Sequence, residues 1–213
     1  MLPLRGLPSL AGPLPSFAPA TAPPAPSPLF AAWLAEAVEA GVREPHAVTL
    51  STVDGRGRPS ARVLILKDLK GDGWQFASTR AGRKGRELAA NPRAALTFYW
   101  SALGRQVRVR GAVSAAGADV SAADFLGRSP SARAVALAGR QGQRLTDPGE
   151  VGPAVEQARA RIDADPGLVS PDWTLYTLHA DEVEFWQGDP DRRHIRLSYR
   201  LGEDGWTKEL LWP

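Results

Sequence analysis

The chain has 213 residues, 43% hydrophobic and 23% charged, which is the composition of an ordinary globular domain. A formal net charge of only +3, without a polybasic tract, gives no reason to expect a nucleic-acid partner. The absence of cysteine excludes disulfides, thiolate catalysis and cysteine-bound zinc, and it favours a reducing, cytoplasmic compartment.

The first residues of the chain are dense in proline and carry one charge, Arg5. Proline at this density prevents the helical core that a signal peptide needs. No apolar run in the chain approaches the length of a membrane span, so we expect no membrane association. The sequence therefore predicts a disordered, polyproline-like tail over residues 1–27 and one folded domain over residues 28–213.

The folded part begins with the pattern of an amphipathic helix. One helical face is expected to hold Phe30, Trp33, Leu34, Ala37 and Val38. Ser27 is a candidate N-cap, and Gly41 is a candidate terminator. Strand patterns follow at residues 46–53, 60–68, 72–79, 94–100 and 105–113, with a short helix expected at residues 82–92.

The second half of the chain is expected to hold helices first and strands afterwards. Start signals for three helices stand at Ser121, Ser129 and Asp147. Further strand patterns cover residues 173–179, 182–188, 192–200 and 206–213. Neighbouring strands joined by short turns predict an α+β fold, a mostly antiparallel β-barrel with peripheral helices.

Two stretches carry polar side chains that suggest a binding site. Ser78, Thr79, Arg83 and Lys84 gather at the start of a predicted helix, where hydroxyls, backbone N–H groups and cations favour a phosphate. A merely solvated basic helix start explains them equally well. The stretch "EFWQGDPDRRHIRL" (residues 184–197) combines an aromatic residue, a turn and several cations, as in a cleft for a flat ligand or a subunit interface. The three histidines share no ligand spacing, so no metal centre is expected.

Five motifs occur in an order that resembles the FMN-dependent pyridoxamine 5′-phosphate oxidase family. They are "RVLILKD", "RKGRELAANPRAALTFYW", "GRQVRVRG", "GRQ" and "EFWQG…RRHIR". The resemblance runs from about Trp33 to Pro213, and it implies an FMN-binding split barrel, a homodimer with FMN at its interface, and a C-terminal dimerisation region over residues 173–213. It also implies an oxidase whose default substrate is pyridoxamine or pyridoxine 5′-phosphate. FMN would oxidise this substrate to pyridoxal 5′-phosphate, with dioxygen as the final acceptor and hydrogen peroxide as the product.

The resemblance also implies which residues form the site. The residues expected around FMN are Arg62, Val63, Leu64, Ser78, Arg83, Lys84 and Gln106, with Gln141, Trp186 and Arg196 coming from the partner subunit. The residues expected to bind the substrate are Lys67, Arg128, Arg192 and His194, of which Arg192 and His194 are also the catalytic candidates. Strand alternation would put Arg192, His194 and Arg196 on one face.

Two positions depart from the family pattern where the family binds the substrate phosphate. Asp124 stands in place of a tyrosine and Ala132 in place of a serine. A carboxylate repels a phosphate, and at i,i+4 spacing Asp124 can also pair with Arg128. Alternatively, Asp124 closes a capping box with Ser121. These departures leave two alternatives open: a related FMN oxidase of another small molecule, as in phenazine biosynthesis, or a flavin-binding protein without turnover.

Overall fold

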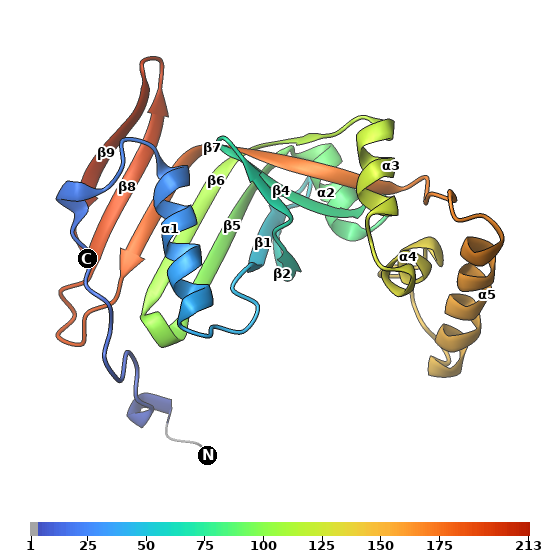
Figure 1. The fold of residues 1–213 in the computed structure, drawn as a ribbon, viewed down its shortest axis with the longest axis horizontal. Helices are drawn as coiled ribbons and strands as arrows, with labels where there is room; N and C mark the ends of the chain where they lie inside the picture. Colours follow the sequence, from blue (N-terminus) through green and yellow to red (C-terminus); the bar gives the residue numbers. More distant parts are fainter. Residues whose placement is uncertain (1–3) are drawn as a thin grey trace.

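The computed structural model describes residues 4–213, and a nine-stranded antiparallel sheet forms its centre (Figure 1). The strands are β1 (Ala47–Val53), β2 (Pro59–Ile65), β3 (Asp68–Lys70), β4 (Gly73–Thr79), β5 (Arg93–Trp100), β6 (Arg105–Ala115), β7 (Trp173–Gln187), β8 (Ile195–Gly202) and β9 (Gly205–Leu211). The main path of neighbours is β2-β1-β5-β6-β7-β4-β3, and β8 joins β7 and carries β9.

Strand β7 changes its pairing partner about halfway along its length. Its first half pairs with β4 and its second half with β8, while β6 runs beside almost its whole length. The register shifts between Arg110 and Gly111, where a Cβ on Gly111 would lie 1.8 Å from the carbonyl oxygen of His179. Glycine therefore permits a bulge at which the partner of β7 changes. The sequence predicted two separate strands here, and the structure corrects this to one continuous strand.

The helices lie around this sheet. Besides α1 (Pro26–Glu39), they are α2 (Arg83–Ala90), α3 (Ala118–Leu126), α4 (Pro130–Leu137) and α5 (Val151–Ala164), with 3-10 turns at Leu4–Gly6, Pro19–Thr21, Ser101–Leu103 and Pro148–Glu150. In Figure 1, α4 and α5 form a lobe beyond the end of β7. No helix among residues 4–213 combines the length and the apolar character that crossing a membrane requires.

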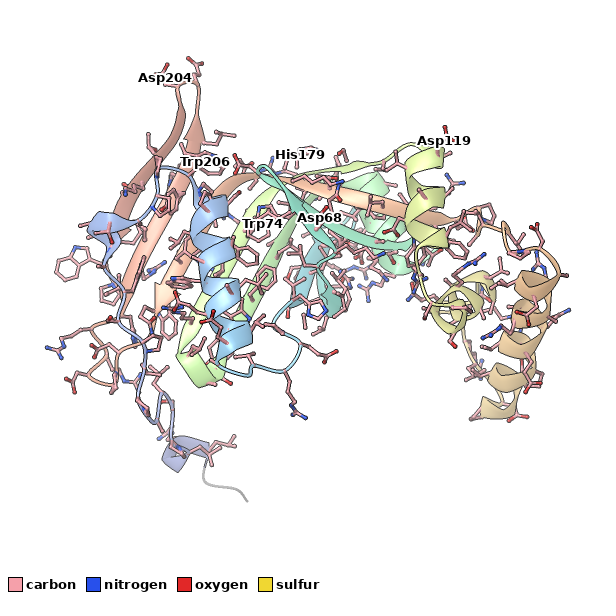
Figure 2. The ribbon with its side chains drawn as sticks, viewed as in Figure 1. Asp68, Trp74, Asp119, His179, Asp204 and Trp206 are labelled. Atoms are coloured by element: carbon pink, nitrogen blue, oxygen red, sulfur yellow. The ribbon has the colours of Figure 1, made fainter. Side chains whose placement is uncertain are left out.

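Helix α1 covers one face of the sheet through its aromatic residues. The Phe30 ring centre lies 4.3 Å from that of Trp74, which Figure 2 shows beside the helix, and Trp33 packs edge-on against Phe185 at 5.2 Å. The predicted apolar face is confirmed for these residues and Ala37, which are buried, but it is wrong for Val38, which is exposed. The predicted cap is wrong: Ala25 occupies the N-cap position, and Ser27 instead donates to Asp72 at 2.6 Å.

Two of the three predicted N-caps of the later helices are confirmed, and one is wrong. Ser129 caps α4 by accepting from the amide of Ala132, and Asp147 caps the 3-10 turn that leads into α5. Ser121 lies inside α3, so the proposed capping box does not form. Its hydroxyl accepts from the amide of Leu175 at 3.2 Å and so ties α3 to β7.

Residues 17–25, which we call the N-terminal strap, pack on the domain. Phe17 lies edge-on to Trp33 with ring centres 5.0 Å apart. The Tyr199 hydroxyl donates to the carbonyl of Pro23 at 2.8 Å, and Lys208 donates to the carbonyl of the buried Ala22. The prediction of a disordered tail up to residue 27 is therefore wrong for the strap, because aromatic contacts and backbone acceptors compensate its loss of chain entropy.

Deleting residues 1–25 should lower stability without abolishing the fold. Burial of one aromatic side chain contributes about 1.5–3 kcal/mol, and each lost hydrogen bond adds about 1 kcal/mol. For a domain of this size we expect a midpoint of thermal unfolding lower by about 5–15 °C. Deleting residues 1–9, whose described members are almost all exposed, is the control and should leave the midpoint unchanged. Equal midpoints for the two truncations would contradict the strap contacts.

Candidate active site

A cleft of about 800 Å³ opens between the sheet and the α4–α5 lobe. Its sheet side includes Arg62, Val63, Leu64, Ser78, Thr79, Lys84 and Trp173, and its far side includes Arg128, Arg140 and Gln141. The cleft therefore gathers five predicted FMN contacts from the sheet side, and its volume suits a small ligand or cofactor.

The cationic end of the cleft has the chemistry of a phosphate site. Lys84 lies in the first turn of α2, where free backbone N–H groups attract anions. Its ammonium donates to the side-chain oxygen of Gln141 at 3.1 Å. Burial lowers the pKa of Lys84, and the nearby charge of Arg62 lowers it further. A phosphate between these two cations would relieve their repulsion, so this donor set fits the phosphate group of FMN.

Glu87 forms a buried anionic floor under this end of the cleft. Its carboxylate accepts from Ser60 at 2.7 Å, from Arg83 at 2.7 Å, from Arg62 at 3.2 Å and from the hydroxyl of Thr52. Burial alone would raise its pKa, but these hydrogen bonds outweigh burial and lower the pKa from 4.5 to about 2. Glu87 is therefore ionised, and it holds the Arg62 guanidinium in place.

Glu87 was not predicted as a site residue, although a single carboxylate in the basic stretch "RKGRELAA" indicates an internal partner for the neighbouring cations. The same carboxylate also binds Arg83, which the resemblance places at FMN. Its Nε donates to Glu87 at 2.7 Å, and its side chain is largely exposed. Arg83 thus supports the floor of the cleft, and its contact with FMN remains a prediction.

The substrate residues Lys67 and Arg128 meet Asp124 and Trp173 at the border of the cleft. Lys67 pairs with Asp124 at 2.5 Å, and the indole N–H of Trp173 donates to the second oxygen of that carboxylate at 2.7 Å. The guanidinium of Arg128 lies over the Trp173 ring, 3.9 Å from its centre. The expected pair between Asp124 and Arg128 is wrong, because Lys67 and Trp173 already take both carboxylate oxygens.

A second group of predicted residues lies across β6, β7 and β8. Gln106 is the register partner of Trp186, which is the register partner of Arg196, so the three side chains share one face of the sheet. Arg196 is fixed by Glu184, with nitrogen–oxygen distances of 2.9 and 3.1 Å. None of these three residues lines the cleft of its own chain, so the contact of Gln106 with FMN remains a prediction. Conversely, Gln141 was expected to come from the partner subunit and lies in the cleft of its own chain.

The catalytic candidates Arg192 and His194 precede β8 and are not part of it. Arg192 is exposed in a turn with a φ of +65°, and the strand begins only at Ile195. The predicted common face of Arg192, His194 and Arg196 is therefore wrong. The ring of His194 lies 4.9 Å from that of Trp186, and its Nδ1 accepts from the amide of Asp189 at 3.1 Å. His194 thus joins the second group through its ring.

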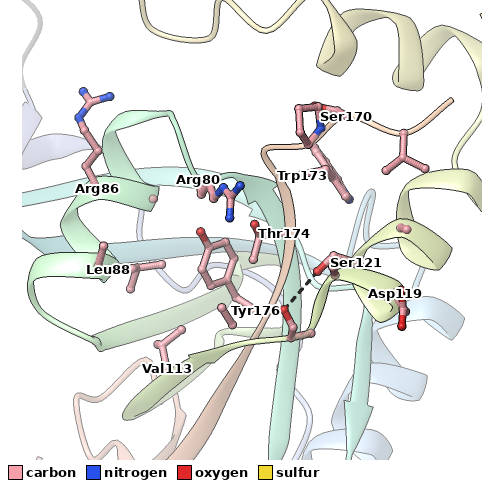
Figure 3. A pocket seen from close by; sticks show the side chains of 18 residues that line it. Arg80, Arg86, Leu88, Val113, Asp119, Ser121, Ser170, Trp173, Thr174 and Tyr176 are labelled. Atoms are coloured by element: carbon pink, nitrogen blue, oxygen red, sulfur yellow. Dashed lines mark hydrogen bonds between the residues drawn. The ribbon is translucent and has the colours of Figure 1, made fainter.

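A smaller cavity of about 610 Å³ lies on the other side of Trp173, between α2 and α3 (Figure 3). Its wall is mainly apolar, with Leu88, Val113 and Tyr176 among its residues. Arg80 at its edge is paired with Asp172 at 3.1 Å. The cavity lacks the gathered cations of the larger cleft, which remains the better candidate for an anionic cofactor.

Comparison with known proteins agrees with this geometry. The family model "Pyridoxamine 5′-phosphate oxidase" matches residues 34–187, and the model "Pyridoxine 5′-phosphate oxidase C-terminal dimerisation region" matches residues 173–213. The chain belongs to the pyridoxamine 5′-phosphate oxidase family. Membership makes it an FMN-dependent oxidoreductase with the split-barrel fold, as the motifs predicted.

Individual relatives cover nearly the whole chain. A pyridoxine/pyridoxamine 5′-phosphate oxidase from Bordetella avium is 45% identical over 186 residues, covering 86% of this chain and 87% of the relative. The crystal structure of PhzG from Burkholderia lata 383 in complex with tetrahydrophenazine-1-carboxylic acid has a TM-score of 0.87 and 29% identity, covering 95% of this chain and 100% of PhzG. An FMN-binding protein from Nostoc punctiforme, at 21% identity and a TM-score of 0.73, shares the fold; it covers 89% of this chain and 98% of its own.

Proposed function

We propose that this protein oxidises pyridoxamine or pyridoxine 5′-phosphate to pyridoxal 5′-phosphate, with dioxygen as acceptor and hydrogen peroxide as product. The observation that supports this proposal best is the cleft in which Arg62, Lys84 and the start of α2 form a phosphate cradle. When bound, FMN supplies the redox chemistry by accepting a hydride from the substrate carbon and passing electrons to dioxygen.

The protein residues would bind and orient. Arg62 and Lys84 hold the phosphate of FMN, while Ser78 and the backbone of Val63 and Leu64 line the rest of its site. Arg128, on the far wall of the same cleft, offers the substrate a cation. Its Nη1 is buried without a hydrogen-bond partner among the described residues. An unpaired buried donor is costly, so an anionic ligand that accepts from Nη1 would bind favourably there.

The second group would complete the site from a partner subunit. Four residues at this place lie apart from the cleft of their own chain and belong to the matched C-terminal dimerisation region. They are Trp186 and Arg196 of the second group, with His194 and the neighbouring Arg192. In a homodimer, this group would cover the flavin of the other subunit, with Arg192 and His194 orienting the substrate. Each FMN would then need both chains.

A second candidate function is oxidation of another small aromatic molecule, as in phenazine biosynthesis. Two observations favour it: the similarity to PhzG, and Asp124 beside Lys67 where a phosphate is expected to bind. A flavin-binding protein without turnover is the less favoured alternative, because such a protein would not need Arg192 and His194 to orient a substrate.

A flavin spectrum and anaerobic reduction test the proposal. The purified protein should be yellow, should sediment as a dimer, and should lose its visible absorbance when mixed without oxygen with pyridoxamine 5′-phosphate. Bleaching by dihydrophenazine carboxylates alone would favour the second candidate. A flavin-loaded protein that none of these compounds reduces would contradict both oxidase functions.

A further inference from the structure

The carboxylate of Asp124 compensates the charge of Lys67 before any substrate arrives. Its side chain is 14% exposed, and its Oδ1 lies 2.5 Å from the Lys67 ammonium. Its Oδ2 accepts the Trp173 indole N–H at 2.7 Å. Because both oxygens have donors and the Lys67 charge is already paired, Lys67 offers less attraction to a second anion than a free lysine would.

Arg128 is the cation that remains uncompensated at this place. It stacks on the same Trp173 ring at 3.9 Å, and no carboxylate among residues 4–213 lies within ion-pair distance of it. Burial lowers the pKa of Arg128, and the nearby Asp124 charge partly offsets this effect. Lys67, Arg128 and Asp124 therefore lie together at the border of the cleft, which Arg128 lines, and form a cluster with one net positive charge.

We infer that Asp124 is a specificity-determining residue that selects a substrate anion of single negative charge. A carboxylate, or a phosphate ester that is ionised once, matches the single net charge of this cluster. A doubly ionised phosphate would keep one charge unmatched and would lie close to Asp124, which repels it. This inference rests on the proposed function only in placing the substrate beside Arg128, and it concerns which anion binds there.

Calorimetric titration of the flavin-loaded protein with benzoate and with phenyl phosphate tests this inference. At pH 8 the phosphate ester is a dianion, because its second pKa lies near about 6, whereas benzoate is a monoanion. Asp124→Asn removes the negative charge and frees Lys67, and its amide oxygen can still accept from Trp173. Asp119→Asn is the matched control, since Asp119 is exposed on the same helix and has no ion pair among the described residues.

We expect the Asp124→Asn substitution to shift the affinity ratio toward phenyl phosphate by about tenfold or more, the scale on which one charge at 4–6 Å moves an equilibrium. The control should leave the ratio within about twofold of the unmodified protein. An unchanged ratio in Asp124→Asn, or no binding of either anion to any variant, would overturn the inference. Because binding is measured without turnover, failure to oxidise a vitamin B6 phosphate would count against the proposed function alone.

Discussion

Replacing Glu87 with alanine is expected to cost about 3–5 kcal/mol of folding free energy, because it leaves buried donors and the Arg62 guanidinium without their acceptor. Flavin content should fall as well, since Arg62 loses the partner that fixes it in the cleft. Chemical denaturation measures the first effect, and the absorbance of bound flavin measures the second. Glu39→Ala, at the exposed end of α1, is the control and should change stability by less than about 0.5 kcal/mol.

The pH dependence of stability provides an independent measurement on Glu87. Its pKa falls from 4.5 to about 2 on folding, which corresponds to about 3 kcal/mol. Since the folded pKa is the lower one, this contribution is fully present above pH 4.5 and is lost as the pH falls toward about 2. Glu87→Gln cannot titrate, so the stability difference between the unmodified protein and this variant should shrink over that interval. A constant difference would show that folding does not lower the pKa of Glu87.

Replacing Lys84 with alanine should weaken FMN binding by one to two orders of magnitude and leave stability nearly unchanged. A charge-assisted contact to phosphate contributes about 1.5–3 kcal/mol, whereas Lys84 has only Gln141 as a hydrogen-bond partner among the described residues. Fluorescence titration of the apoprotein with FMN measures the affinity. Arg86→Ala removes a charge from the same helix outside the cleft and should bind FMN normally.

Arg62→Ala should affect both FMN affinity and folding stability, whereas the sequence suggests an effect mainly on FMN affinity. From the motif alone, we expect it to weaken FMN binding far more than stability, as for Lys84. In the structure Arg62 also donates to Leu50, Thr52, Ser60 and Glu87, so its removal should reduce both quantities. An unchanged FMN affinity in both the Lys84 and Arg62 variants would contradict the phosphate cradle.

Local patterns predicted the elements well where one face is buried. The alternation of Val107 and Val109 with Arg108 and Arg110 appears in the structure as buried and exposed positions of β6. The continuity of β7 could not be predicted, because it depends on the strands with which β7 pairs. One strand that changes its partner halfway has the same local pattern as two separate strands. The start of β8 was misplaced for a related reason: the left-handed backbone at Arg192 depends on the turn that Asp189 organises.

The site residues, too, could be predicted from the sequence only in part. The cationic residues of the cleft could be named from motifs, since their neighbours in sequence are also neighbours in space. The partners of Asp124 could not, because Lys67 and Trp173 lie 57 and 49 residues away and reach it only through the tertiary fold. A helical i,i+4 neighbour is a default partner that a better-placed distant donor can replace.

The strap has a consequence for the order in which the protein is made. Its carbonyl groups at Ala22 and Pro23 wait for Lys208 and Tyr199, which follow 186 and 176 residues later. Ribosomal synthesis runs from the N-terminus, so the strap emerges before β8 and β9 and can dock only after these two strands have left the ribosome. We therefore expect protease cleavage near residue 20 to be rapid in nascent chains that lack β8 and β9 and slow in chains that contain them. Docking of the strap would thus report that β8 and β9 have been made.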